Sequence, residues 1–217
     1  MHPHLRTHRP LVAILRGLPA TDAAAIGRAL FEGGWRLLEV PLNREGALAC
    51  IRTLAAMAPA DAIVGGGTVL EVADVDAVHA AGGRLVVAPN CRPAVIERAV
   101  GLGMLCAPGV GTASEAFDAL RCGAQALKLF PAEVWGPRGL KALKSVLPEG
   151  TPLWPVGGVA PDDVAAWVQA GATGLGLGSQ LYRPGDDAHA LRVRADAFVA
   201  AWDATQPAAD PRKGATP

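Results

Sequence analysis

Short apolar runs alternate with longer amphipathic stretches from residue 11 to residue 202. Continuous apolar runs of this kind suit strands that are buried on both faces, as the strands of a parallel sheet are. The predicted strands are residues 11–17, 36–43, 62–69, 84–90, 104–110, 126–131, 152–159 and 174–181. The amphipathic stretches predict helices at residues 22–33, 45–57, 72–81, 93–101, 113–122, 138–147, 161–170 and 188–202.

Eight strand–helix units, spaced roughly 20–27 residues apart, indicate an α/β protein with a parallel sheet. Eight such units close naturally into a single-domain (β/α)8 TIM barrel, which we expect over residues 11–205. The alternative is a doubly wound open sheet. That fold usually carries a glycine-rich dinucleotide turn after its first strand, and the sequence LRGLPATD at this place is not such a turn. We expect an N-terminal tail at residues 1–10 and a disordered C-terminal tail at residues 206–217.

Charge and cysteine usage narrow the class of function. The formal net charge is zero, so the chain has no basic field to attract nucleic acid or an anionic membrane. The four cysteines form no CxxC pair and no histidine cluster accompanies them, so we expect reduced thiols, no metal site and no cofactor. The apolar run at residues 11–15 is too short to span a membrane, and the cytoplasm is the expected location.

The polar residues at strand ends carry the chemistry, because the C-terminal ends of barrel strands form the active site. Lys128 lies between two leucines in the sixth predicted strand, and alternation directs it inward. Burial favours the neutral amine over the ammonium, and a neutral amine can attack a ketone. The competing interpretation is a lysine paired with a carboxylate in a salt bridge inside the barrel.

Glu39 supplies a carboxylate on the inward face of the second predicted strand. Cleavage of a carbon–carbon bond through an imine needs one group that moves several protons in succession. The histidines fall in the N-terminal tail or on predicted helices, so Glu39 remains by elimination. The competing interpretation is a plain ion pair to Arg16, which ends the first strand, or to Lys128.

Glycines follow the seventh and eighth predicted strands, in PVGGVAP and LGLGSQL. Backbone N–H groups of glycine turns can approach a phosphate closely, and this is the usual phosphate position in such barrels. We therefore predict a phosphate site at Gly157, Gly158, Gly178 and Ser179. The competing interpretation is that these glycines merely form tight turns.

Residues 11–185 resemble the family of 2-keto-3-deoxy-6-phosphogluconate and 2-keto-3-deoxy-6-phosphogalactonate aldolases (KDPG and KDPGal aldolases). The segments that carry the resemblance are VAILRG, LLEVPLN, VGGGTV, VVAPN, APGVGTASEAF, ALKLFPAEVWGP, PVGGVAPDD and GLGSQLYRPG. The resemblance implies a small, metal-free (β/α)8 barrel that forms a homotrimer and cleaves a phosphorylated keto-deoxy sugar acid to pyruvate and glyceraldehyde 3-phosphate. It also implies that Lys128 forms the Schiff base and that Glu39 is the general acid and base.

The same resemblance implies the remaining binding residues. Arg16 and Thr68 match positions that bind the pyruvate-derived end of the substrate, and the four phosphate-site residues match as well. Val156 matches the wall beside the C4 hydroxyl of the substrate. The further substrate-binding positions that we expect are Asn43, Pro89 and Phe130.

Three segments distinguish the two subfamilies. This chain carries EVPLN at residues 39–43, APN at residues 88–90 and VGG at residues 156–158, and all three resemble the galactonate type. It departs from the family pattern at Arg44-Glu45, where Ser-Pro is common, and at Ala88, where threonine is common. We therefore expect 2-dehydro-3-deoxy-6-phosphogalactonate as the substrate. The gluconate epimer, or both epimers, is the alternative.

Two other classes of function share parts of these features. A barrel isomerase or decarboxylase that acts on a sugar phosphate would have the phosphate site but would not need an imine. A catalytically silent protein that binds sugar phosphates would have the phosphate site but would catalyse no reaction. Trapping of a pyruvate adduct with borohydride separates the aldolase from both, because only the aldolase forms the covalent adduct.

Overall fold

The predicted alternation of strands and helices is present in the computed structural model, which describes residues 8–206. The predicted tails at residues 1–10 and 206–217 therefore lie almost wholly outside the described residues. The strands are β1 (Leu11–Ile14), β2 (Leu37–Pro41), β3 (Ile63–Gly67), β4 (Leu85–Val87), β5 (Leu105–Ala107), β6 (Gly109–Val110), β7 (Leu127–Leu129), β8 (Leu153–Pro155) and β9 (Leu175–Leu177). The helices are α2 (Ala23–Glu32), α3 (Ala47–Met57), α4 (Val72–Ala80), α5 (Pro93–Gly101), α6 (Ala113–Arg121), α7 (Ala132–Lys144), the short 3-10 helix η1 (Pro161–Asp163), α8 (Val164–Gln169) and α9 (Ala188–Asp203).

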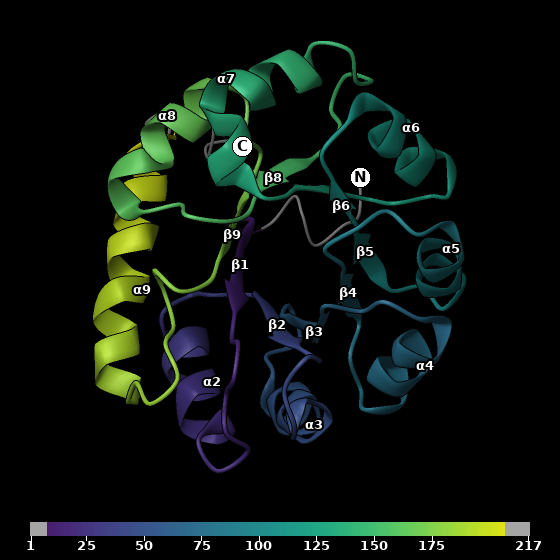
Figure 1. Cartoon of the computed structure of the whole chain (residues 1–217). Helices are drawn as coiled ribbons and strands as arrows, with labels where there is room; N and C mark the ends of the chain where they lie inside the picture. The colour runs from purple at the N-terminus through teal and green to yellow at the C-terminus, as the bar shows by residue number, and fades with distance from the viewer. Residues whose placement is uncertain (1–7, 207–217) are drawn as a thin grey trace, which may run out of the picture.

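The strands form a curled parallel sheet in the middle of the molecule, and the helices surround it in chain order from α2 to α9 (Figure 1). Six strands are hydrogen-bonded in the order β5-β4-β3-β2-β1-β9, and three more in the order β6-β7-β8. Only Pro108 separates β5 from β6, and an isolated parallel bridge links Val156, directly after β8, to Gly176 of β9. The α/β class and the parallel sheet are confirmed.

The core divides into two clusters, as the alternation of side chains along the strands predicts. Leu38, Val40, Leu127 and Leu129 belong to the large cluster that the strands share with the helices. A second cluster lies inside the curled sheet, and its members are Val12, Leu37, Ile63, Leu85, Val87, Leu105, Ala107, Ala126 and Trp154. Because Leu37 and Ala126 lie on the inner side, the residues two positions further along each strand, Glu39 and Lys128, point inward as well.

The largest difference from the sequence-based prediction is in α7, which begins at Ala132 rather than at residue 138. It contains a kink at Gly136, whose φ of 61° and ψ of 175° are not helical. Pro137 follows directly and begins the second helical segment, where the missing N–H of proline is tolerated. The predicted strand 104–110 is also divided, because Pro108 has no N–H to donate to a neighbouring strand.

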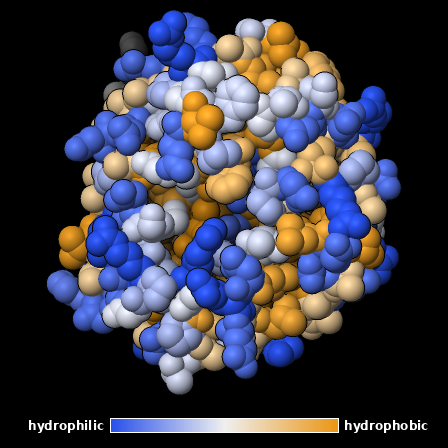
Figure 2. Space-filling view, viewed as in Figure 1, coloured by the Kyte–Doolittle hydropathy of each residue, from blue (hydrophilic) through white to orange (hydrophobic). Residues whose placement is uncertain are grey.

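The face of the molecule shown in Figure 2, the same as in Figure 1, carries hydrophilic residues interspersed with hydrophobic ones, both at its edge and toward the middle. In residues 8–206 no helix combines the length and apolar character needed to cross a membrane.

Candidate active site

Lys128 lies at the centre of β7, and only 6% of its surface is exposed. Its neighbours Leu127 and Leu129 pack outward into the large core cluster, which fixes the inward direction of the lysine. Its backbone N–H donates to the carbonyl of Pro108 at 2.9 Å, so the strand holds it from one side as well. The Nζ atom of Lys128 lies 4.9 Å from the centre of the Phe130 ring. The amine is therefore held in a largely apolar environment.

Glu39 occupies the third position of β2 and is 2% exposed. Its Oε2 atom is buried and has no hydrogen-bond partner. The carboxyl group fits because Gly67 of β3 has no side chain: a Cβ at that position would lie 2.8 Å from Cδ of Glu39. A buried carboxyl oxygen without a partner is costly for folding, and such groups are often retained for chemistry.

Burial changes the protonation of both groups. Desolvation lowers the pKa of Lys128; the nearby charge of Glu39 opposes this change and that of Arg16 adds to it. Desolvation raises the pKa of Glu39, against the opposing effects of Lys128 and Arg16. Among the ion pairs of residues 8–206, none involves Lys128 or Glu39. Burial therefore shifts both groups toward their neutral forms, and no direct ion pair joins them in the described residues.

The lowered pKa of Lys128 predicts a gain in stability when the lysine is replaced by methionine. The unfolded chain titrates near the ordinary value of 10.5, above the folded pKa. Between these two values the unfolded state binds more protons, so the free energy of unfolding of the wild type rises with pH. Below the pKa that Lys128 has in the folded protein, burial of its charge therefore lowers the free energy of unfolding by the full amount. We expect Lys128→Met to raise the free energy of unfolding by about 1–2 kcal/mol at neutral pH.

This gain should shrink as the pH approaches 10.5, and urea denaturation of both proteins over a range of pH measures it. Lys141→Met is the matched control, because Lys141 is exposed on α7 and its loss should change stability little. A Lys128→Met protein that is less stable than the wild type at neutral pH would show that the charged lysine stabilises the fold.

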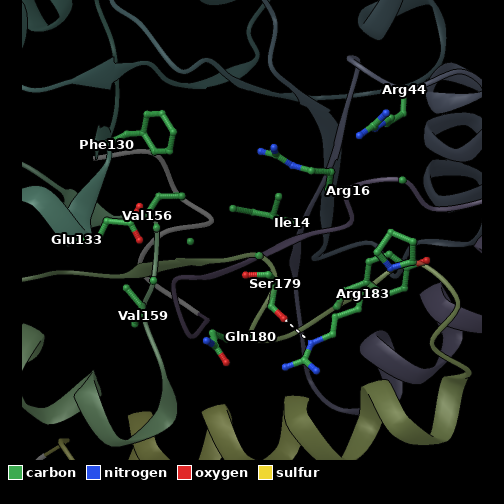
Figure 3. A pocket seen from close by; sticks show the side chains of 17 residues that line it. Ile14, Arg16, Arg44, Phe130, Glu133, Val156, Val159, Ser179, Gln180 and Arg183 are labelled. Atoms are coloured by element: carbon green, nitrogen blue, oxygen red, sulfur yellow. Dashed lines mark hydrogen bonds between the residues drawn. The ribbon is translucent and has the colours of Figure 1, made fainter.

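Arg16 and Thr68 flank the buried pair. Arg16 is exposed two residues beyond β1, and its guanidinium extends toward Phe130 (Figure 3). Thr68 directly follows β3 with a φ of 53°, which is in the left-handed region that branched residues rarely adopt. A residue in such a backbone conformation destabilises the folded state by about 1–3 kcal/mol, and such residues are concentrated at functional sites. The strained threonine follows Gly67, which lies against Glu39.

A cavity of about 400 Å³ opens next to these residues. It contains seven of the residues predicted from the sequence, which are Arg16, Phe130, Val156, Gly157, Gly158, Gly178 and Ser179. Lys128 and Glu39 do not line the cavity itself. Lys128 lies next to the lining residue Phe130, and Glu39 interacts electrostatically with Lys128 and Arg16.

The two glycine turns lie on the wall of this cavity. Gly157 and Gly158 have φ values of 116° and 71°, which residues with a side chain rarely adopt. Gly178 begins a turn in which its carbonyl accepts from the N–H groups of Leu181 and Tyr182 at 2.8 and 2.9 Å. The turns after β8 and β9 therefore border one cavity, as the predicted phosphate site requires.

Three further predicted residues lie outside the cavity lining, namely Thr68, Asn43 and Pro89. Asn43 is exposed in the loop after β2, and Pro89 packs closely on Gly109, where a Cβ would lie 2.3 Å from the Pro89 backbone. Their assignment as substrate-binding residues rests on the resemblance alone and stays a prediction.

Several cavity residues were not predicted from the sequence. They include Ile14, Arg44, Glu133, Gln180, Tyr182 and Arg183. The carboxylate of Glu133 lies beside Gly158, because a Cβ on that glycine would be 2.8 Å from its Oε2 atom. Glu133 and Arg183 occur in two of the segments that carry the family resemblance, and this is the sequence signal from which they could have been predicted.

A metal site was not predicted. Within residues 8–206, no group of three or more histidine, cysteine, aspartate or glutamate residues is arranged to hold a metal ion. Independence of a metal stays a prediction.

Comparison with known proteins places the chain among aldolases. The family model of KDPG and KHG aldolase matches residues 3–191. The chain is 45% identical to the 2-dehydro-3-deoxy-6-phosphogalactonate aldolase of Escherichia coli (strain K12), over 91% of this chain and 96% of the relative.

Solved structures agree with this result. A native KDPGal structure superimposes with a TM-score of 0.90 and 44% identity, over 92% of this chain and 97% of the other. The KDPG aldolase of Legionella pneumophila, with pyruvate captured as a covalent carbinolamine intermediate, superimposes with a TM-score of 0.76. It is 25% identical, over 95% of this chain and 99% of the other.

Proposed function

Because the chain belongs to the KDPG and KHG aldolase family, we propose that it cleaves 2-dehydro-3-deoxy-6-phosphogalactonate to pyruvate and glyceraldehyde 3-phosphate, with Lys128 as the Schiff-base nucleophile. One observation carries this proposal: a buried lysine of lowered pKa and a buried glutamic acid of raised pKa lie together beside a cavity with two glycine turns. The direct test is incubation of the purified protein with this substrate and measurement of released pyruvate.

The reaction begins at the amine of Lys128. The neutral nitrogen attacks the C2 ketone, and a carbinolamine forms. The carboxyl group of Glu39 protonates the hydroxyl at C2, which leaves as water and yields the iminium. The captured carbinolamine of the Legionella pneumophila relative supports the assignment of this chemistry to the family.

Cleavage follows from the electron demand of the iminium. Glu39, now a carboxylate, takes the proton of the C4 hydroxyl directly or through a water molecule. The C3–C4 bond breaks, its electron pair enters the iminium, and the product at Lys128 is an enamine. Glyceraldehyde 3-phosphate leaves. A proton then returns to C3, and hydrolysis of the resulting iminium frees pyruvate and the amine.

The remaining residues hold and orient the substrate. Arg16 binds the carboxylate beside C2, where a bidentate guanidinium fixes its orientation, and Thr68 assists at the same end. The N–H groups of Gly157, Gly158, Gly178 and Ser179 receive the phosphate. We assign Phe130, Asn43 and Pro89 to the walls around the chain of the sugar acid.

The same proposal includes the closed barrel, the homotrimer and the cytoplasmic location. The Pro108 junction between β5 and β6 and the Val156–Gly176 bridge between β8 and β9 support an eight-strand closure. The four free cysteines are those expected in a reducing compartment. Family resemblance alone supports the trimer, and light scattering tests it.

The epimer preference is expected to depend on Val156. The two epimers differ at C4, whose hydroxyl loses its proton, and Val156 is a buried apolar residue of the cavity wall. A threonine here could donate a hydrogen bond to one epimer, whereas valine has nearly the same shape and cannot. We expect the wild type to cleave the galacto epimer faster. Val156→Thr should shift the ratio of the two kcat/KM values toward the gluco epimer by roughly two- to tenfold.

Val159→Thr is the matched control, since Val159 also lines the cavity but lies beyond the paired glycines. Its ratio of kcat/KM values should equal that of the wild type. Wild-type preference for the gluco epimer would refute the substrate assignment and favour the alternative KDPG aldolase, with the Schiff-base mechanism intact.

A further inference from the structure

Arg44 is a departure from the family pattern that the proposed mechanism does not use. It stands in the loop between β2 and α3, directly after the EVPLN segment. The side chain is exposed, yet it lines the same cavity as Arg16 and Ser179 (Figure 3). No ion pair of the described residues involves Arg44, so its charge is available to a ligand.

The cavity lining has an excess of positive charge. Arg16, Arg44 and Arg183 line it together with a single acidic residue, Glu133. Arg183 donates from Nε to the carbonyl of Ser179 at 3.1 Å, which ties it to the turn after β9. Within residues 8–206 Arg44 forms no ion pair with a carboxylate, so its guanidinium can bind an anion in the cavity.

The depth of Lys128 decides which anionic group Arg44 can meet. The carbon that bonds to Lys128 is C2, and the carboxylate is attached to that carbon. Because Lys128 is buried, the carboxylate end lies at the closed end of the site. The phosphate, on C6, is at the other end of the molecule and faces the mouth. Arg16 is exposed as well, but its guanidinium extends toward Phe130, which lies next to Lys128, whereas Arg44 stands farther from Phe130 (Figure 3). Of the two arginines, Arg44 is therefore the one placed for the phosphate end.

We propose that Arg44 is a specificity-determining residue that binds the substrate phosphate from the β2–α3 loop, opposite the glycine turns after β8 and β9. This inference rests on the proposed function, because it takes the orientation of the substrate from the bond to Lys128. Backbone N–H groups contribute no net charge, so a guanidinium adds charge complementarity that the glycine turns lack. Arg44 thus favours phosphorylated over unphosphorylated keto-deoxy acids.

The test compares two substrates in one pair of variants. In Arg44→Ser, kcat/KM for 2-dehydro-3-deoxy-6-phosphogalactonate should fall about five- to twentyfold, through KM and not kcat. For the unphosphorylated 2-dehydro-3-deoxygalactonate, kcat/KM should equal that of the wild type. The defect with the phosphorylated substrate should also become smaller at high salt, because Arg44 is exposed to screening ions.

Arg52→Ser is the matched control, since it removes the same charge from an exposed site on α3 of the same strand–helix unit. Its kcat/KM should be unchanged with both substrates. The inference is overturned if Arg44→Ser lowers kcat/KM equally for both substrates, or lowers it no more than Arg52→Ser does. A change in kcat alone would also overturn it. A wild type that releases pyruvate from neither phosphorylated epimer would instead refute the proposed function.

Discussion

Replacement of Lys128 by alanine is expected to reduce pyruvate release by roughly three to six orders of magnitude, because the covalent route is lost completely. Without the amine no iminium can form, and the electrons of the C3–C4 bond have no acceptor. Lys128→Arg should fail to a similar degree, since guanidinium stays protonated in proteins and cannot attack a ketone. A coupled assay for pyruvate measures both variants.

This interpretation requires that the inactive variant be folded. Lys128→Met keeps the volume of the buried side chain and is expected to stabilise the fold, so this variant should be as inactive as Lys128→Ala while remaining folded. Lys141→Ala is the control, because Lys141 lies exposed on α7 and should be replaceable without loss of rate. A Lys128→Ala enzyme with more than a few per cent of wild-type activity would contradict the assignment.

Replacement of Glu39 by glutamine is expected to slow cleavage by about two to four orders of magnitude, which is the usual contribution of a general acid or base. Glutamine has nearly the same shape as protonated glutamic acid but cannot transfer the proton of the C4 hydroxyl. Burial raises the pKa of Glu39, so this carboxyl group stays protonated to higher pH than an exposed glutamic acid does. A pH–rate profile of the wild type should accordingly contain a limb that Glu39→Gln lacks.

A purely structural role for Glu39 would give a different result. Glu39→Gln should still form a borohydride-stable adduct at Lys128, only more slowly, because the amine is intact. Glu133→Gln is the matched control, since Glu133 also lines the cavity but lies beside Gly158, and its kcat should stay within about tenfold of wild type. Equal losses of kcat in the two variants would remove the special role of Glu39.

The inner and outer sides of the strands could be predicted from the sequence because side-chain alternation is a local property of the backbone. The positions of Lys128 and Glu39 inside the sheet follow from it, and both are confirmed as buried. The strands themselves are shorter than predicted, for example Leu127–Leu129 in place of residues 126–131. Several apolar residues directly after a strand are still buried, such as Leu15, Ala88 and Val156, so an apolar run does not mark where strand pairing ends.

Loop residues could not be predicted in the same way. Arg44 lies beyond the end of β2, and the direction of its side chain depends on the turn that leads to Gly46, whose φ is 80°. The early start of α7 also depends on a kink at Gly136, a local feature that periodicity does not reveal. An isolated charged residue stands out in the sequence when it lies within the apolar run of a buried strand. An exposed arginine in a loop does not stand out, whether or not it lines a cavity.

The central claim is that Lys128 forms a covalent bond with the keto acid, and one measurement tests it most directly. The wild-type protein is incubated with pyruvate, reduced with borohydride, digested and analysed by mass spectrometry. We predict one reduced pyruvate adduct per chain, on the peptide that contains Lys128, and none in Lys128→Ala. An adduct on Lys141 or Lys144, or cleavage activity without any adduct in the wild type, would contradict the account.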